Sequence, residues 1–396
     1  PHFDRFKDYF GDTFIGYFSD EPRFANGTNW YFNTINTMFD YKLGRLSLAY
    51  PFNDKVLKKL EEKGYSRLDF LSFFIDLNEK TNDFRIDYMN IITDEYSSNY
   101  SKQLALWCHN HDVLYSNHII EDNGCHFYTG CSSGHYFKTT RHSDYAGIDV
   151  VFHQIKPYYS NKDNISFIES GIANHKFFSY TLGKLASSVA VQSESAKGKS
   201  LCEIFGAYGW GESVSDMLYL VNHMAICGIN NFIPHAFSMN INDLDCPPFF
   251  NAQGMNPSFD AYKELFEYMK FLGQYSHKSY AKVAVYYNSD SAWSNSIRYS
   301  IDEIAKTLMQ NQIEFDFIDY DNLQKSTVKD GYFSIGDIDT EFHMEEVKYV
   351  SKGLLDFSLG LVIYSDKYYG GVALNHFTQP KEGFLVEGDN SMSNLP

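Results

Sequence analysis

The chain has 396 residues, a net charge of −17 and 44% hydrophobic residues. This length predicts one large domain with a smaller one, and the apolar content supports a globular core. A nucleic-acid binder needs a basic face, and no run of Lys and Arg supplies one. No stretch reaches the ~18 uncharged apolar residues of a membrane span, so neither nucleic acid nor membrane is an expected partner.

The cysteine content bears on the location of the protein, and the aromatic content on the kind of ligand that it binds. The six cysteines contain no CxxC pair, which indicates reduced thiols and a cytoplasmic protein. The chain begins with Pro1, and we expect its true N-terminus to be missing, so the lack of a signal peptide weighs little. The aromatic fraction of 17% favours a carbohydrate site, because aromatic rings stack on the apolar faces of sugars.

In chain order, a buried strand is predicted at 14–18, and it ends at Asp20-Glu21-Pro22. Asn53 or Asp54 can cap a helix that stops at Gly64. An apolar stripe at helical spacing predicts a longer helix over about 84–109.

The rest of the first 275 residues alternates strands with helices. Ser213 and Asp216 resemble a capping box that opens a helix ending at Gly228. The other predicted strands are 113–116, 147–152, 199–202 and 229–233, and the other predicted helices are 174–194 and 258–272.

This alternation predicts a parallel α/β architecture. Five strands precede residue 240, whereas a closed (β/α)8 TIM-type barrel needs eight. We therefore expect residues 1–275 to be a partial barrel that is truncated at its N-terminus and holds strands four to eight. The alternative is an open sheet that is complete as it stands.

The pattern changes after residue 280. A strand at 281–286, a helix at 300–310 and a strand at 313–318 form a second βαβ unit, and 360–364 can add a strand. These elements predict a doubly wound α/β domain over 280–377. Residues 378–396 are rich in Pro, Gly, Asn and Ser and are expected to form a loose tail.

Two carboxylates stand at predicted strand ends, Glu21 and Glu203. A strand that ends in an acid is how barrels present catalytic groups, and two acids suffice to cleave a glycosidic bond. Glu21 lies among aromatic residues, which would raise its pKa and suit a general acid. Glu203 is an isolated charge that must be paired or face a cleft. A capping acid or a rim ion pair is the structural alternative.

At a carboxyl separation of about 5 Å the two acids would act by double displacement with retention. Glu203 would attack the anomeric carbon, while Glu21 would protonate the leaving oxygen and then activate water. Tyr208 and Trp210 could supply a sugar platform. His235, at the end of the last strand, is interpreted as a substrate-binding residue or a structural histidine.

A rival site is a cluster of histidines and acids that could bind a divalent metal. Its spacing matches no strict metal motif, so no metal and no cofactor are expected. Glu121 ends a strand and is the reserve catalytic acid. The cluster comprises His118, Glu121, Asp122, His126 and His135.

Four segments within residues 10–275 resemble the catalytic barrel of bacterial glycoside hydrolases of the large clan that includes the β-galactosidases. Some such sequences are described as α-L-rhamnosidase-like. The segments are 15–23, 107–108 with 117–122, 147–151, and 201–210 running to 231–237, of which the first and last are the specific ones.

The resemblance implies that Glu21 is the acid/base and Glu203 the nucleophile. The clan usually has Asn just before the acid/base, where it contacts the sugar 2-hydroxyl, and this chain departs from that pattern with Asp20. The segment from 280 resembles a flavodoxin-like domain that assists oligomerisation, so a homo-oligomer is an expected partner. The substrate-binding candidates are Asp20, Asn117, His118, Glu121, Tyr208, Trp210 and His235.

The sequence thus favours a retaining glycosidase that removes a terminal sugar from an oligo- or polysaccharide. A non-catalytic carbohydrate-binding or interaction protein on a degenerate barrel is the second hypothesis, and a metal-dependent hydrolase is the third.

Overall fold

The structure is a computed structural model. It divides into two compact units, Pro1–Phe342 and His343–Pro396. It describes residues 2–23, 50–119, 124, 129, 132–157, 164–168, 171–238, 246–274, 279, 281–294, 300–329, 332–335, 338–343, 359–364 and 369–374.

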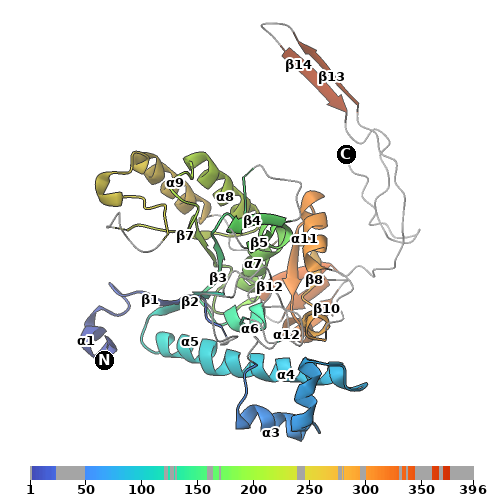
Figure 1. The fold of residues 1–396 in the computed structure, drawn as a ribbon. Coiled ribbons are helices and arrows are strands. Elements are labelled where there is room, and N and C mark those ends of the chain that lie inside the picture. The colour runs from blue at the N-terminus through green and yellow to red at the C-terminus, as the bar shows by residue number, and fades with distance from the viewer. Residues whose placement is uncertain are drawn as a thin grey trace. The chain divides into compact units, whose positions relative to one another are not determined.

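The first unit is built on a sheet of five parallel strands in the order β1-β2-β3-β6-β7 (Figure 1). All five coincide with predicted strands, because each is a short apolar run. The strands are β1 (Gly16–Ser19), β2 (Leu114–His118), β3 (Tyr145–Val150), β6 (Ser200–Ile204) and β7 (Asn231–Pro234).

The expectation of an eight-stranded barrel, truncated or not, is wrong for the residues that the structure describes. Their parallel sheet has five strands, with β1 and β7 at its two ends. Both end strands line one hollow of about 760 Å³, so the sheet is curved but open. Apolar runs identify strands, whereas closure depends on strand number and stagger, which no single run encodes.

Helices cover the sheet in chain order. The helical stretch predicted at 84–109 is α4 (Thr81–Tyr96), a π-helical turn (Ser97–Ser101) and α5 (Lys102–His109), and α5 packs on β2. Before it, α3 (Asp54–Glu62) begins where the Asn53 side chain accepts a hydrogen bond from the Val56 N–H at 2.9 Å. A 3-10 segment (Arg67–Phe73) follows.

Further helices follow β3 in the chain. A π-helical turn (Phe177–Leu182) leads into α7 (Gly183–Gln192), which packs on β3 and β6. The predicted capping box of Ser213 and Asp216 is confirmed at the start of α8 (Val214–Ile226). Helix α9 (Phe259–Leu272) packs on β7, where Figure 1 shows it beside α8.

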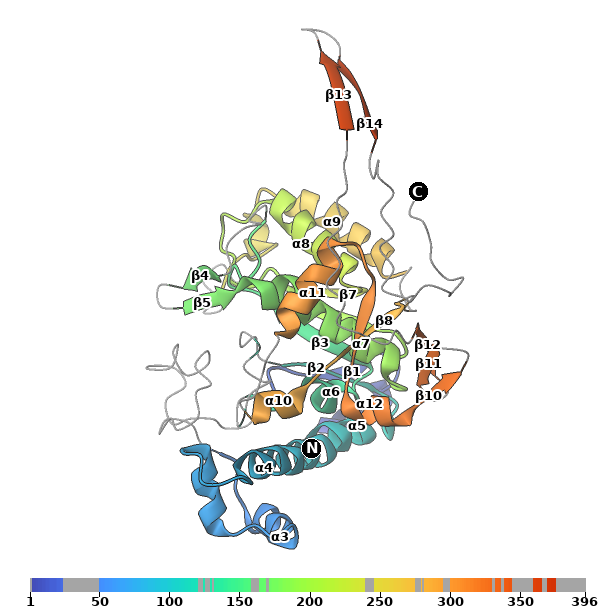
Figure 2. The same ribbon diagram turned by 90° about the vertical axis from the view of Figure 1, so that its right-hand side faces the viewer.

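Among the described residues from 281, the parallel sheet has two strands, which is smaller than the doubly wound sheet expected over 280–377. The βαβ elements exist, as the parallel strands β8 (Val283–Tyr286) and β9 (Phe315–Ile318) with α10 (Ser289–Trp293) and α11 (Ile301–Gln310) between them. This pair packs alongside α7 (Figure 2) and shares the main hydrophobic core.

Buried charges fix this pair to α7. Lys184 Nζ lies 3.2 Å from Asp316 Oδ1 and 2.9 Å from Glu314 Oε1. The Ser188 hydroxyl also donates to Asp316 and accepts from the Phe317 N–H. Because a buried charge must be compensated, this network favours one mode of docking.

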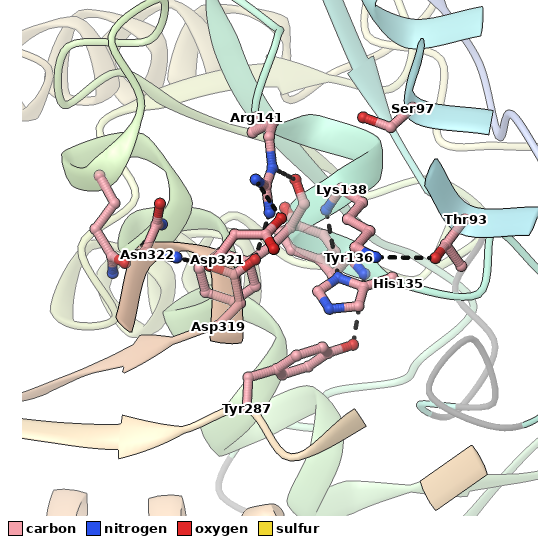
Figure 3. Close-up of polar contacts among 12 residues, drawn as sticks. Thr93, Ser97, His135, Tyr136, Lys138, Arg141, Tyr287, Asp319, Asp321 and Asn322 are labelled. Atoms are coloured by element: carbon pink, nitrogen blue, oxygen red, sulfur yellow. Dashed lines mark hydrogen bonds and ion pairs between the residues drawn. The ribbon is translucent and has the colours of Figure 1, made fainter. Parts of the chain in front are cut away.

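A second polar cluster joins α6 (Tyr136–Thr140) to the segment after β9 (Figure 3). Arg141 binds Asp319 and Asp321, at the start of α12 (Tyr320–Lys325). Lys138 Nζ donates to Thr93 at 3.3 Å, which ties α6 to α4 as well.

The remaining strands are antiparallel. In the first unit, β4 (Asn164–Ile168) pairs with β5 (Gly171–Asn174), and β10 (Ser326–Lys329), β11 (Tyr332–Ile335) and β12 (Ile338–His343) form a three-stranded sheet. The second unit contains the hairpin β13 (Leu359–Tyr364) and β14 (Tyr369–Leu374). None of the helices in the described ranges is long and apolar enough to span a bilayer.

Candidate active site at the carboxyl edge of the sheet

Charged side chains from neighbouring strands meet where the five strands end. In a parallel sheet all carboxyl ends lie at one edge, which is where α/β enzymes place reactive groups. Asp20 follows β1, His118 ends β2, Glu203 is the fourth residue of β6, and His235 follows β7. The register sets Ser19 beside Asn117, and thus Asp20 next to His118.

His118 joins two of the acids. Its Nε2 lies 3.1 Å from Asp20 Oδ1 and 3.1 Å from Glu203 Oε2. The His118 side chain is 1% exposed, that of Glu203 18% and that of Asp20 75%. The acids therefore meet the solvent while the imidazole that links them is buried.

The second ring nitrogen of His118 also faces an acceptor. Nδ1 lies 3.1 Å from the carbonyl oxygen of Ile119, which can only accept a hydrogen bond. Because both nitrogens face acceptors, the doubly protonated ring satisfies all of these contacts. The arrangement is an imidazolium between two carboxylates.

The electrostatics agree with this geometry. Burial alone would lower the pKa of His118, but hydrogen bonds to Asp20 and Glu203 and the charges of Asp149 and Glu203 raise it well above its usual value. The pKa of Asp20 is lowered, chiefly by its hydrogen bond to His118 and further by the charges of His118 and His235.

Gly147 lies on β3, the strand between those that carry His118 and Glu203. It is the β3 residue in register with His118. A Cβ on Gly147 would lie 2.2 Å from the Asn117 carbonyl oxygen and 3.2 Å from the His118 Cβ. A side chain at this position would therefore collide with the backbone of β2 beside His118, so glycine is required where the two strands approach.

Glu21 follows Asp20 directly and is half-buried. Its backbone is left-handed, with φ of 42°, so the strand alternation ends at this residue. Asp20 is the acid of this pair for which a contact with His118 is seen.

Three other predicted substrate-binding residues differ in their burial and in their contacts. Asn117 is buried, and its Oδ1 accepts a hydrogen bond from Ser143 at 2.7 Å. Tyr208 is buried, and its hydroxyl donates to the Ile155 carbonyl at 2.8 Å. Trp210 is 52% exposed and its ring lies 5.6 Å from that of Phe249, so it is the candidate that offers an aromatic surface.

His235 is half-buried and approaches the loop that follows β6. A Cβ on Gly206 would lie 3.3 Å from the His235 Cγ, so the absence of a side chain at Gly206 admits this ring. Phe205 and Ala207, on either side of Gly206, have left-handed backbones with φ of 83° and 57°. Such strained positions cluster at functional sites.

Two of the five residues of the predicted metal cluster, His118 and His135, lie in the described ranges. Glu121, Asp122 and His126 lie outside the described residues. His135 is buried, and its Nδ1 caps α6 by accepting from the Lys138 N–H at 3.3 Å. Within the described ranges, the group with metal-ligand spacing is Asp20, His118 and Glu203, whose donor atoms lie within 4.8 Å of one another. A cation there would require Nε2 to lose its proton.

Sequence reasoning missed two buried acids, Asp149 and Glu212. Asp149 stands in β3 in register with Glu203, and the signal for it was an acid within the apolar run 147–151. Glu212 precedes α8, and both of its carboxyl oxygens are buried without a hydrogen-bond partner among the residues that the structure describes. Burial, together with the charge of Asp216, raises the pKa of Glu212 to about 9.

Below the charged layer the concave face of the sheet is apolar. The hollow is lined by the side chains two residues before Asp20, His118, Gly147 and Glu203, because every second residue of a strand faces the same way. These residues are Phe18, Ser116, Tyr145 and Leu201. The site is therefore the charged rim of a largely apolar hollow.

No protein-family model matches the chain, and neither does any curated protein sequence. Among solved structures, the chain is similar to a rhamnosidase from Novosphingobium sp. PP1Y, with a TM-score of 0.48 and 13% sequence identity. The similarity covers 74% of this chain and 26% of the rhamnosidase, so the chain spans about a quarter of that protein's length.

Proposed function

We propose that this protein is a glycoside hydrolase whose catalytic carboxylates are Glu203 and Glu21. The observation that carries the proposal is the contact of His118 with both Asp20 and Glu203 at the carboxyl edge of the parallel sheet. It supports an active site there because a buried imidazolium between two acids costs desolvation energy, and such perturbed ionisable groups cluster at functional sites.

Glu203 has the properties that a nucleophile of this kind needs. It is partly exposed, it comes from a strand, and it accepts a hydrogen bond from a protonated imidazole. That hydrogen bond orients the carboxylate oxygen that would attack. Its oxygen would bond to the anomeric carbon of a terminal sugar as the glycosidic C–O bond breaks.

Glu21 is proposed as the acid/base. It would give its proton to the departing oxygen, which releases the alcohol and leaves the sugar esterified to Glu203. It would then take a proton from a water molecule whose oxygen attacks the anomeric carbon. The ester bond breaks, the sugar is released with retained configuration, and both carboxyl groups return to their starting states.

The other residues have supporting roles in this proposal. Asp20 and His118 would bind sugar hydroxyls or hold Glu203 in place, and His235 would contact the same sugar. The exposed Trp210 ring would stack on a sugar face. The substrate is thus an oligo- or polysaccharide with a terminal sugar that fits this rim.

The test is hydrolysis of a panel of 4-nitrophenyl glycosides that includes α-L-rhamnoside and β-galactoside. We expect turnover of at least one of them, and a loss of about 10³-fold or more in Glu203→Gln. Glu264→Gln is the matched control, because Glu264 is an exposed acid on α9. Full activity of a folded Glu203→Gln protein would refute the proposal.

The stereochemical part is tested separately by following the released sugar with proton NMR. Initial formation of the anomer that matches the substrate supports double displacement, while the opposite anomer would replace it with a single inverting step.

A further inference from the structure

Asp149 is an acidic residue within the buried, otherwise apolar stretch of strand β3. Strand β3 is buried from Ala146 to Val150, and Asp149 itself is 5% exposed, between Ile148 and Val150, which are fully buried. A carboxylate in such a place costs several kcal/mol unless an opposite charge compensates it.

The register places Asp149 in the layer of the site. It pairs with Glu203 on β6, and Gly147, two residues earlier on the same face, pairs with His118 on β2. Asp149 therefore stands beside Glu203 and diagonally across from His118. Its negative charge acts on the buried imidazole, together with that of Glu203.

His118 is thus surrounded by groups from three strands. Asp20 follows β1 and Glu203 belongs to β6, and both have an oxygen 3.1 Å from Nε2. Asp149 lies on β3 in register with Glu203, and the Phe18 ring of β1 lies 5.2 Å from the His118 ring. The charge of His235 contributes to lowering the pKa of Asp20. Of the two carboxylates nearest to the ring inside the sheet, Glu203 would lose its charge on forming a sugar ester, whereas Asp149 would keep its own.

We propose that Asp149 is a positioning residue that holds the His118 imidazolium in place while Glu203 alternates between carboxylate and ester. This inference rests on the proposed function. Asp149 touches no substrate in this account. It acts through His118, which in turn orients the oxygen of Glu203 that attacks.

The first test needs no turnover. Histidine ring signals of the full chain are followed by NMR over pH, with His118→Asn used to assign His118. We expect the titration midpoint of His118 to fall by about one pH unit or more in Asp149→Asn, and to return in Asp149→Glu, which keeps the charge. An unchanged midpoint in a folded Asp149→Asn protein would overturn the inference.

The second test is the pH profile of kcat/KM on whichever glycoside the protein hydrolyses. In Asp149→Asn we expect the alkaline limb to move to lower pH and kcat/KM at pH 8 to fall about tenfold or more, with a smaller loss at pH 6. Asp260→Asn, at an exposed acid of α9, is the control. A lower Tm with an unmoved profile would show a merely structural role.

The two proposals fail in different ways. If the wild-type protein hydrolyses no glycoside, the proposed function fails, while the NMR midpoints still decide whether Asp149 acts on His118. If Asp149→Asn does not fold, Asp149→Glu and Asp149→Ser give the same comparison of midpoints with and without the charge.

Discussion

His118 Nε2 lies 3.1 Å from Glu203 Oε2, although strand β3 separates the strands that carry them. Gly147, the β3 residue in register with His118, lets β2 approach β3 closely at this point. Four predictions follow from this arrangement and from the buried charges around the core.

The contact makes stability depend on pH through His118. Its pKa is raised in the folded state, so its contribution is complete below the unfolded pKa of about 6.5 and is lost as pH rises through the folded pKa. We expect the free energy of unfolding, measured with urea from pH 6 to pH 9, to fall more steeply in the wild type than in His118→Asn. Parallel curves would show that the imidazole is not held by the two acids.

Gly147 should be intolerant of any side chain. Gly147→Ala places a Cβ 2.2 Å from the Asn117 carbonyl oxygen, so β2 and β3 must separate. We expect a loss of about 2–4 kcal/mol in the free energy of unfolding, with a loss of activity that exceeds the unfolded fraction. Gly211→Ala is the control, because a Cβ there meets nothing within 4 Å. Equal stability of both variants would disprove the role of Gly147.

The ion pair between Lys184 and Asp316 should hold the β8–β9 pair on α7. Both side chains are nearly fully buried, so Lys184→Met leaves the Asp316 charge uncompensated. We expect a loss of about 3–5 kcal/mol in urea unfolding, and a partial recovery in the double variant Lys184→Met with Asp316→Leu. Lys263→Met removes an exposed pair and should cost at most about 1 kcal/mol. A loss of that small size in Lys184→Met would contradict the docking role.

Glu212 should destabilise the folded protein as pH rises. Its pKa is raised to about 9 by burial and by Asp216, so folding retains a proton that the unfolded chain releases above about pH 4.5. Relative to Glu212→Gln, the wild type should lose stability steadily from pH 4.5 to 9, by an amount on the order of a few kcal/mol. A difference between the two proteins that does not change with pH would show that Glu212 is ionised or solvated.

The local elements were largely predictable from the sequence. The five strands of the sheet are apolar runs, and the caps at Asn53 and Ser213 were visible as residue types at fixed offsets from the helix start. The hairpin β4–β5 was not expected, because it interrupts the alternation of strand and helix that the rest of the sequence displays.

The assembly of these elements was not predictable in the same way. The number of strands suggested part of a closed barrel, yet the pairing gives an open sheet, since closure is a property of stagger between strands. The βαβ unit after 281 was expected to build its own sheet. It forms a two-stranded sheet, which packs on α7 through the buried contact of Lys184 with Asp316, two residues that are 132 positions apart.

For the site, the sequence identified the residue types but not their contacts. Asp20, His118 and Glu203 were all candidates because each stands at a strand end. That one imidazole joins both acids depends on the register of three strands and on Gly147. Asp149 was overlooked because an acid inside an apolar strand has no signature until its neighbours on the adjacent strands are known.

The most direct test of the central claim is to trap the sugar on Glu203. The protein is treated with an activated 2-deoxy-2-fluoro glycoside of the sugar that it hydrolyses, and the adduct is located by mass spectrometry of its peptides. We predict one sugar per chain, attached to the peptide that contains Glu203 and absent in Glu203→Gln. An adduct on another carboxylate, or the same adduct in Glu203→Gln, would contradict the account.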